Sequence, residues 1–492
     1  MLFYPITSIF LSCMLFNSYI FLIFLLFVLP LYYYLPAKYK NWLLLLSSYV
    51  FYGYWDWRFC LLLLASTVID FYIGKVMHHT EAPAARKRLL LASLFANLGI
   101  LGFFKYFNFF IGSFEEMLGG AGSNLDFLHL HIILPVGISF YTFQTLSYTI
   151  DIYRKKLKPT DSLLDFAVFV AFFPQLVAGP IERASNLLPQ IQLRPNPTRD
   201  QIKKGVVLII IGLFRKVMIG DTTGRIVDHI FTEPEYYASA ELLMGLILFS
   251  IQIYADFSGY SHIARGTSKL LGIELMKNFE QPYLSTNITE FWRRWHISLS
   301  SWLRDYLYIS LGGNRYGVSR TYINLMLTML LGGLWHGASW TFVIWGGLHG
   351  IYLAVHKWML KDKKIPDSYR YAGPKSFVIF LGKVFATYVL VLFTWLFFRV
   401  ASFNDALYFL EKIVFWQNSE LSMRVFEICF SFMALTLLFD FFEYYTKSHT
   451  YLLHLERYKL QPVATGVLTS MAIVVLIYIF QAEPLPFIYF QF

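Results

Sequence analysis

Long apolar stretches separated by short polar segments dominate this chain of 492 residues. Runs such as Tyr19–Leu35, Leu89–Ile111 and Ala464–Phe480 fall in the range of about 17–25 residues that a helix needs to cross a bilayer. Such runs recur from one end of the sequence to the other. The pattern predicts an all-α, polytopic membrane protein.

The apolar runs predict about eleven to twelve membrane spans in a single membrane-embedded domain over 1–492. The segment 163–180 differs from the others because Pro174, Gly179 and Pro180 interrupt it. Broken backbone at membrane depth is tolerated only against protein or a water-filled cavity, so we expect a re-entrant pair of half-helices there. The expected spans lie near 3–35 (one span or a pair), 42–54, 57–74, 89–111, 132–150, 205–220, 242–258, 321–335, 338–356, 377–398, 425–445 and 462–481.

Charge supports this interpretation and adds an orientation. Only 15% of the residues are charged, against about 25% in soluble domains. The net charge of +10 is carried by short loops, which indicates an orientation signal and attraction to anionic lipids, not a nucleic-acid site. Loops 36–41 and 75–88 are then cytoplasmic and both chain termini lie on the outer side. Arg215 and Lys216, near the outer end of a span, fit this scheme poorly.

Polar side chains accumulate within residues 279–349. If 289–308 is one helix, its aromatic residues share a face. The simplest interpretation is an amphipathic helix in the headgroup layer, with tryptophans as anchors. Such a helix has no need of the imidazole of His296, which favours a functional site instead. The residues concerned are Trp292, Arg293, Arg294, Trp295, His296, Trp302, Arg304, Asp305 and Tyr306.

A second histidine, His336, stands in the sequence Gly332-Gly-Leu-Trp-His-Gly337, at the expected tip of a helical hairpin. A lone histidine on an apolar face is usually a core residue. Neighbouring glycines, however, let backbones and ligands approach closely, and an ionisable group at membrane depth favours function. Histidine can take a proton from an alcohol near neutral pH. His349 and His356 lack a metal-binding spacing, so no metal site is predicted.

The motif residues resemble the membrane-bound O-acyltransferase (MBOAT) family, within it the bacterial branch that acetylates alginate, peptidoglycan or cellulose. The resemblance rests on four segments: Asn278–His296, Trp302–Tyr308, Gly312–Arg315 and the Gly-Leu-Trp-His-Gly sequence around His336. It implies a helical fold around a central funnel, with a catalytic core at about 251–356. It also implies that His336 matches the near-invariant family histidine and His296 the second motif position.

The resemblance further implies the transfer of an acetyl group from cytoplasmic acetyl-CoA, across a bacterial inner membrane, to a polysaccharide outside. No bound cofactor is expected, and a periplasmic partner of the SGNH or esterase-like type would complete the transfer. His336 would act as general base, and His296 would orient or polarise the thioester carbonyl. Expected donor-binding residues are Trp292, Arg293, Arg294, Trp295, Arg304 and Arg315, because arginine suits phosphate; expected supporting residues are Asp256, Asp305 and Trp335.

Three alternatives stay open from the sequence. In the first, the arginines serve only to orient the protein in the membrane. A transporter or flippase also uses broken spans and midplane polar groups, but it should show paired interruptions in two related halves, and the sequence shows none. A non-catalytic scaffold of a polysaccharide synthase would tolerate the substitution His336→Ala, whereas an acyltransferase would not.

Overall fold

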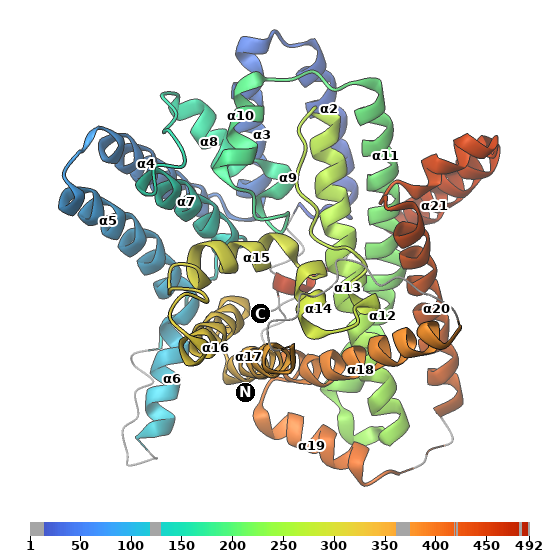
Figure 1. Ribbon diagram of the computed structural model, residues 1–492. Helices are drawn as coiled ribbons and strands as arrows, with labels where there is room; N and C mark the ends of the chain where they lie inside the picture. The colour runs from blue at the N-terminus through green and yellow to red at the C-terminus, as the bar shows by residue number, and fades with distance from the viewer. Residues whose placement is uncertain are drawn as a thin grey trace. The chain divides into compact units, whose positions relative to one another are not determined.

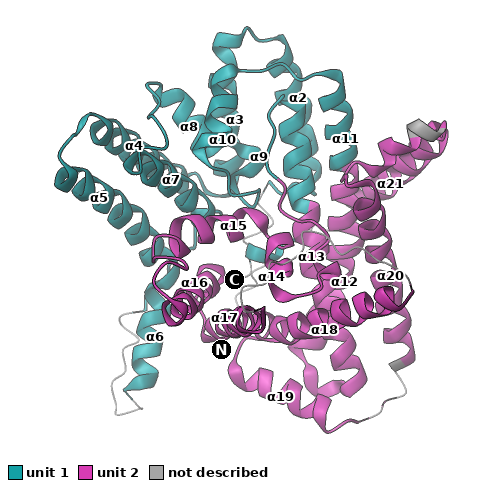
Figure 2. Ribbon diagram, in the orientation of Figure 1, with its two compact units in different colours: residues 1–209, 260–276, 482–491 teal, residues 210–259, 277–481, 492 magenta. Residues whose placement is uncertain are grey.

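The computed structural model describes residues 14–118, 129–360, 374–417, 419, 422–481 and 485–490. Within these ranges the secondary structure is helical, without strands. The chain forms two compact units, residues 1–209, 260–276 and 482–491 in one and residues 210–259, 277–481 and 492 in the other (Figure 2). The sequence-based prediction that they act as a single domain stays a prediction.

Unit 1 contains the N-terminal helices (Figure 1). Most of α11 (Arg199–Phe214) and the end of α13 (Ser239–Leu270) also belong to it. The other helices and helical turns of four or more residues are α2 (Tyr19–Tyr34), α3 (Ala37–Asp56), α4 (Arg58–His79), α5 (Pro83–Leu101), the π-helical turn η1 (Gly102–Tyr106), α6 (Phe107–Met117), α7 (Ile138–Tyr153), α8 (Leu163–Ala171), α9 (Phe173–Leu176) and α10 (Ala184–Leu193).

Buried hydrogen bonds hold the apolar helices α4 and α5 together. The Ser93 hydroxyl donates to Oδ1 of Asp70 at 2.6 Å, and the Asn97 amide donates to Oδ2 of the same carboxylate at 2.8 Å. Apolar contact alone gives little association between helices in lipid, where polar pairs and close packing supply the specificity. This cluster therefore accounts for a charged residue inside a predicted span.

The interrupted segment 163–180 forms two short helices. α8 has nine residues and α9 has four, and every residue from Asp165 to Pro180 is buried. A nine-residue helix is about 14 Å long, half the bilayer core of about 30 Å. The prediction of two short half-helices is confirmed, and their re-entrant course in the membrane stays a prediction.

Unit 2 holds the motif-bearing segment and the C-terminal helices (Figure 1). Most of α13, a 32-residue helix about 48 Å long, belongs to it. The other helices and helical turns of four or more residues are η3 (Arg215–Asp221), α12 (Thr222–Thr232), α14 (Ile288–Arg294), α15 (Ile297–Trp302), η6 (Leu303–Tyr308), α16 (Val318–His336), α17 (Trp340–Leu360), α18 (Pro374–Arg399), α19 (Phe403–Val414), α20 (Ser422–Thr446), η7 (Tyr451–Tyr458) and α21 (Gln461–Gln481).

Glycines bring α16 and α17 into direct backbone contact. A Cβ atom at Gly333 would lie 2.2 Å from the carbonyl oxygen of Phe342, and one at Gly346 would lie 2.3 Å from that of Met329. These positions have no room for a side chain. The hairpin predicted around His336 is confirmed, because α16 ends at this residue and α17 begins at Trp340.

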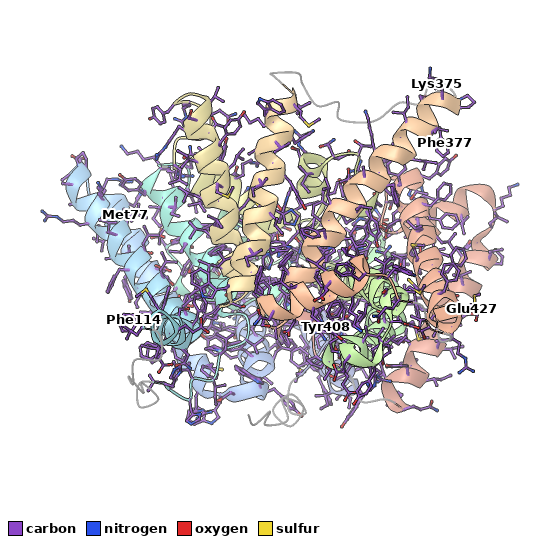
Figure 3. The ribbon with its side chains drawn as sticks, turned by 90° about the horizontal axis from the view of Figure 1, so that it is seen from below. Met77, Phe114, Lys375, Phe377, Tyr408 and Glu427 are labelled. Atoms are coloured by element: carbon purple, nitrogen blue, oxygen red, sulfur yellow. The ribbon has the colours of Figure 1, made fainter. Side chains whose placement is uncertain are left out.

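Six helical segments in the described ranges are long and apolar enough to cross a membrane: Arg58–His79, Pro83–Met117, Ser239–Leu270, Pro374–Arg399, Met423–Thr446 and Gln461–Gln481. This is fewer than the eleven to twelve spans expected. The helix Tyr19–Tyr34 is apolar but shorter, and residues 1–13 of the first expected span lie outside the described residues. Figure 3 shows α18 between its first residues, Lys375 and Phe377, and the short helix α19 with Tyr408.

Candidate active site

The motif segment breaks at His296, so the single helix expected over 289–308 is wrong. α14 ends at Arg294, and His296 adopts the left-handed conformation with φ of 42° before α15 begins. A non-glycine residue in this conformation costs of order 1–3 kcal/mol and persists only where its surroundings hold it. The aromatic residues Trp292, Trp295, Trp302 and Tyr306 are buried. They are therefore not the membrane-surface anchors of an amphipathic helix.

His296 is completely buried and bound to the segment that precedes α14. Its Nδ1 lies 3.2 Å from Oδ1 of Asn278, and its ring meets that of Phe257 edge to face at 4.6 Å between centroids. Burial lowers the pKa of His296 to about 3, because a charged imidazolium is poorly solvated there. The ring is therefore neutral at physiological pH.

His336 lies among aromatic rings at the end of α16. The rings of Trp335, Trp345 and Phe398 lie 5.1, 5.0 and 5.3 Å from its ring between centroids, with interplanar angles of 82°, 85° and 68°. Gly337 follows, where a Cβ atom would be 2.1 Å from the Phe342 ring. The glycine lets α17 close over the end of α16 and leaves the imidazole 3% exposed.

The structure brings the two predicted histidines together although forty residues separate them. Their ring centroids are 6.4 Å apart, and the Trp335 ring lies 6.0 Å from that of His296. A direct hydrogen bond needs nitrogens about 3 Å apart, which two rings at this separation cannot reach. One small reacting group, such as a carbonyl or a hydroxyl, could contact both.

A third buried histidine, His349 of α17, has both ring nitrogens bound. The indole N–H of Trp292 donates to its Nδ1 at 3.2 Å, and its Nε2 lies 3.0 Å from Oγ1 of Thr394. Because that hydroxyl donates to the carbonyl of Val391, it accepts from the imidazole N–H. His349 therefore joins α14, α17 and α18 structurally, and it engages the polar group of Trp292.

The four arginines expected to bind the donor differ in their surroundings. Arg293, Arg304 and Arg315 are exposed, and the Arg304 side chain forms an ion pair with Asp305 at 2.7 Å. Arg294 is half-buried and binds Glu290 at 2.7 Å. The exposed arginines can reach a ligand in solvent. Arg294 is held within its own helix.

The cations that fitted the charge pattern poorly are buried and paired. Lys216 of η3 lies 2.5 Å from Asp221 and 2.6 Å from Asp256, the predicted supporting residue. Arg215 binds Glu443 of α20 at 2.8 Å, and the amide of Gln281 donates to the other oxygen of that carboxylate at 3.0 Å. Gln281, three residues after Asn278, is thus hydrogen-bonded to α20.

Two of these structural roles were not predicted from the sequence. Asn278 stands within the motif that carried the family resemblance, yet the amide alone gives no sign that it binds His296. Glu443 belongs to an apolar helix far along the chain, and nothing in its neighbourhood points to Gln281. Both roles depend on tertiary contacts across 18 and 162 residues.

Comparisons with known proteins show the family to which this chain belongs. The profile of the membrane-bound O-acyltransferase family, MBOAT, matches residues 154–362. The probable alginate O-acetylase AlgI of Pseudomonas aeruginosa is 44% identical over 414 residues, covering 83% of this chain and 77% of the relative. The chain belongs to the MBOAT family. It is accordingly an O-acyltransferase and a multi-pass membrane protein.

The names of other relatives in the family differ in the acceptor polymer or in the acyl group. The peptidoglycan O-acetyltransferase of Helicobacter pylori is 38% identical over 417 residues, covering 79% of this chain and 76% of the relative. The teichoic acid D-alanyltransferase of Streptococcus thermophilus is 30% identical over 324 residues, covering 61% and 74%. The matched family region contains both His296 and His336.

Proposed function

We propose that this protein moves an acetyl group from cytoplasmic acetyl-CoA across a bacterial inner membrane for O-acetylation of an extracytoplasmic polysaccharide, with His336 and His296 as the catalytic pair. The observation that carries the proposal is the meeting of these two imidazoles, 6.4 Å apart between ring centroids, among buried aromatic rings. An excluded, apolar environment strengthens electrostatic stabilisation of a reacting group and keeps water away from the thioester.

The reaction needs one proton acceptor and no redox step. The oxygen of an acceptor hydroxyl attacks the thioester carbonyl carbon and forms the ester bond. The carbon–sulfur bond breaks, and CoA leaves as a thiolate that takes up the released proton. His336 is the proposed general base for the hydroxyl proton, a role suited to imidazole near neutral pH. His296 is proposed to lie beside the reacting carbonyl and hydroxyl as the second imidazole of the site.

The charges of unit 2 support a phosphate-bearing donor. Arg293, Arg304 and Arg315 are exposed near the histidines in sequence, and arginine makes strong, directed bonds to phosphate. CoA is highly charged and cannot cross lipid, so only the acetyl group needs to pass. A periplasmic SGNH or esterase-like protein is the proposed partner that receives it, and the termini are proposed to lie on that side.

Acetyl is favoured over D-alanyl as the acyl group because the more similar relatives are named as O-acetylases. Alginate and peptidoglycan, the polymers in those names, are the model acceptors for this protein. Supplying acetyl-CoA and a D-alanyl thioester donor to the same preparation separates the two. We expect acetyl consumption to dominate.

The decisive experiment compares His336→Ala with His356→Ala in membranes that contain the acceptor and its partner. His356 is a half-buried histidine of the same hairpin, bound to Thr289 at 2.7 Å. We expect His336→Ala to reduce acetyl transfer about 10²- to 10⁴-fold, the range for losing acid–base assistance, and His356→Ala to retain it. Equal activity in both variants at equal protein levels would reject the catalytic pair and favour the scaffold.

A transporter or flippase is the remaining alternative and makes a different prediction. It would move an intact lipid-linked or acylated sugar without releasing free CoA. Stoichiometric CoA release with acetyl-CoA as the sole acyl source supports the transferase. Transport without CoA release would contradict it.

A further inference from the structure

Asn278 sits directly against His296 and is itself 1% exposed. Its side-chain oxygen Oδ1 accepts the backbone N–H of Ser298 at 3.2 Å and the Ser298 hydroxyl at 2.8 Å. The same oxygen lies 3.2 Å from Nδ1 of His296. Its backbone carbonyl accepts the N–H of Ile297 at 2.9 Å. The residue thus contacts three consecutive residues at the break between α14 and α15.

These contacts determine which end of the amide faces the histidine. A backbone N–H is only a donor, so the atom that faces Ser298 N must be the amide oxygen. The reversed amide would direct an NH₂ group against this N–H. The oxygen that faces Nδ1 of His296 has lone pairs only, so Nδ1 must carry the ring proton. In neutral imidazole the other nitrogen, Nε2, is then an acceptor.

We infer that Asn278 is a positioning residue that holds His296 as the Nδ1–H tautomer, so that this ring acts in the active site as a hydrogen-bond acceptor through Nε2. The effect on catalysis rests on the proposed function. The assignment of the tautomer rests only on the hydrogen bonds of Asn278. It differs from one expectation from the sequence, that His296 orients or polarises the thioester carbonyl. A carbonyl needs a donor, and Nε2 of this tautomer has no proton to donate.

An acceptor at this position serves the reaction differently. It can receive a hydrogen bond from the attacking hydroxyl, and its lone pair lies near the positive charge that His336 carries once that ring has taken a proton. In both cases a lone pair beside the developing positive charge stabilises proton removal. The arrangement follows the general rule that a working imidazole is oriented through its other nitrogen.

The segment that carries Asn278 is held from two directions. The N–H of Glu280 donates to the carbonyl of Arg294 at 3.0 Å, which ties the segment to the end of α14. The Gln281 amide donates to Glu443 at 3.0 Å, and the paired Arg215 neutralises this carboxylate. These bonds hold the segment on both sides of Asn278, so we expect its oxygen Oδ1 to keep its position beside His296 during the reaction.

The tautomer can be tested without any enzyme assay. The full-length protein, labelled with ¹⁵N-histidine and placed in lipid bilayers, gives distinct ¹⁵N signals for protonated and unprotonated ring nitrogens. A spectrum of His296→Gln assigns the signal by its loss. We expect His296 to carry its proton on Nδ1, whereas His349, bound by Trp292 and Thr394, carries it on Nε2 and serves as an internal reference. An Nε2–H tautomer for His296 would overturn the inference and leave the proposed function standing.

Three variants connect the tautomer to the reaction. Asn278→Ala removes the acceptor, and we expect mixed tautomers with transfer about tenfold to a hundredfold slower, as for partners that orient metal-bound histidines. Asn278→Asp keeps an acceptor, so we expect it to restore the Nδ1–H tautomer and most of the rate. Ser298→Ala is the comparison variant: it removes the hydroxyl that lies 2.8 Å from the amide oxygen and 3.4 Å from Nδ1 of His296 but leaves the backbone N–H in place, so we expect the Nδ1–H tautomer to persist.

The pH profile separates positioning from a merely structural role. A carboxylate beside His296 favours the imidazolium and raises its pKa. The acid limb of the Asn278→Asp profile should therefore move to higher pH than in the wild type. An unchanged profile in Asn278→Asp, or an unchanged tautomer in Asn278→Ala, would overturn the inference. If Asn278→Ala fails to fold, the wild-type spectrum and the Asp variant still decide.

Discussion

Arg215 and Glu443 form a buried ion pair, with 2.8 Å between Nη2 and Oε1 and with 3% and 2% of their side chains exposed. The same arginine lies 3.9 Å from Asp440, whose carboxylate accepts the hydroxyl of Tyr254 at 2.8 Å. Removing one partner of such a pair leaves a charge in a medium that solvates it poorly. The loss of folding stability is then much larger than the net contribution of the intact pair to that stability.

We therefore expect Arg215→Met to lower the free energy of unfolding by about 3–5 kcal/mol. Arg304→Met is the matched control, because that arginine is exposed and its pair with Asp305 contributes only about 0–1 kcal/mol. Thermal unfolding of both variants in the same detergent gives the comparison. Equal unfolding temperatures would show that η3 and α20 are not held by this pair.

The glycine contact between α16 and α17 makes a second prediction. Gly346→Ala places a methyl group 2.3 Å from the carbonyl oxygen of Met329, so the helices must separate and His336 must move. The next residue is the control, because a Cβ atom at Gly347 meets only the Leu330 side chain, at 3.5 Å. We expect Gly346→Ala to lose most acetyl transfer, since misplacement by about 1 Å can cost 10²-fold, and Gly347→Ala to keep it. Comparable rates in the two variants would contradict the close contact.

The sequence predicted the elements of this fold better than their contacts. Helical periodicity and apolar length located six of the expected spans in the described ranges, the broken segment at 163–180 and the helical hairpin around His336, because these depend on local composition. The break at His296 was missed because a left-handed residue at this point is imposed by Asn278 and the surrounding rings, not by the local sequence. The pairing of Arg215 could not be predicted, because its partner lies 228 residues away.

A third prediction concerns Trp292, which was expected to bind the donor. Its indole N–H donates to His349, so Trp292→Phe should lower the free energy of unfolding by about 1–3 kcal/mol, the cost of an unsatisfied buried acceptor. The KM for acetyl-CoA should stay unchanged. The control is Trp358→Phe on α17, the helix that carries His349, at a residue 64% exposed. It should change neither the free energy of unfolding nor the KM. A raised KM with normal stability would instead place Trp292 in the donor site.

The last prediction tests the exposed arginines as ligands of the CoA phosphates. A phosphate contact remote from the thioester is nearly the same in the ground state and the transition state, so its loss should raise KM and leave kcat almost unchanged. For Arg293→Gln, Arg304→Gln or Arg315→Gln we expect KM for acetyl-CoA to rise about tenfold to a hundredfold, the range for one charge-assisted hydrogen bond. His336→Ala should lower kcat instead.

Two further variants make this test specific. Arg294→Gln should mainly reduce stability, because that side chain binds Glu290 at 2.7 Å and lies over the ring of Tyr444. Arg58→Gln removes an exposed arginine of α4, paired with Asp56, and should leave KM at the wild-type value. Initial rates of CoA release across acetyl-CoA concentrations, at two salt concentrations, give KM and its electrostatic part. If the three exposed variants keep the wild-type KM, these arginines orient the protein in the membrane, and the donor phosphates are bound by other residues.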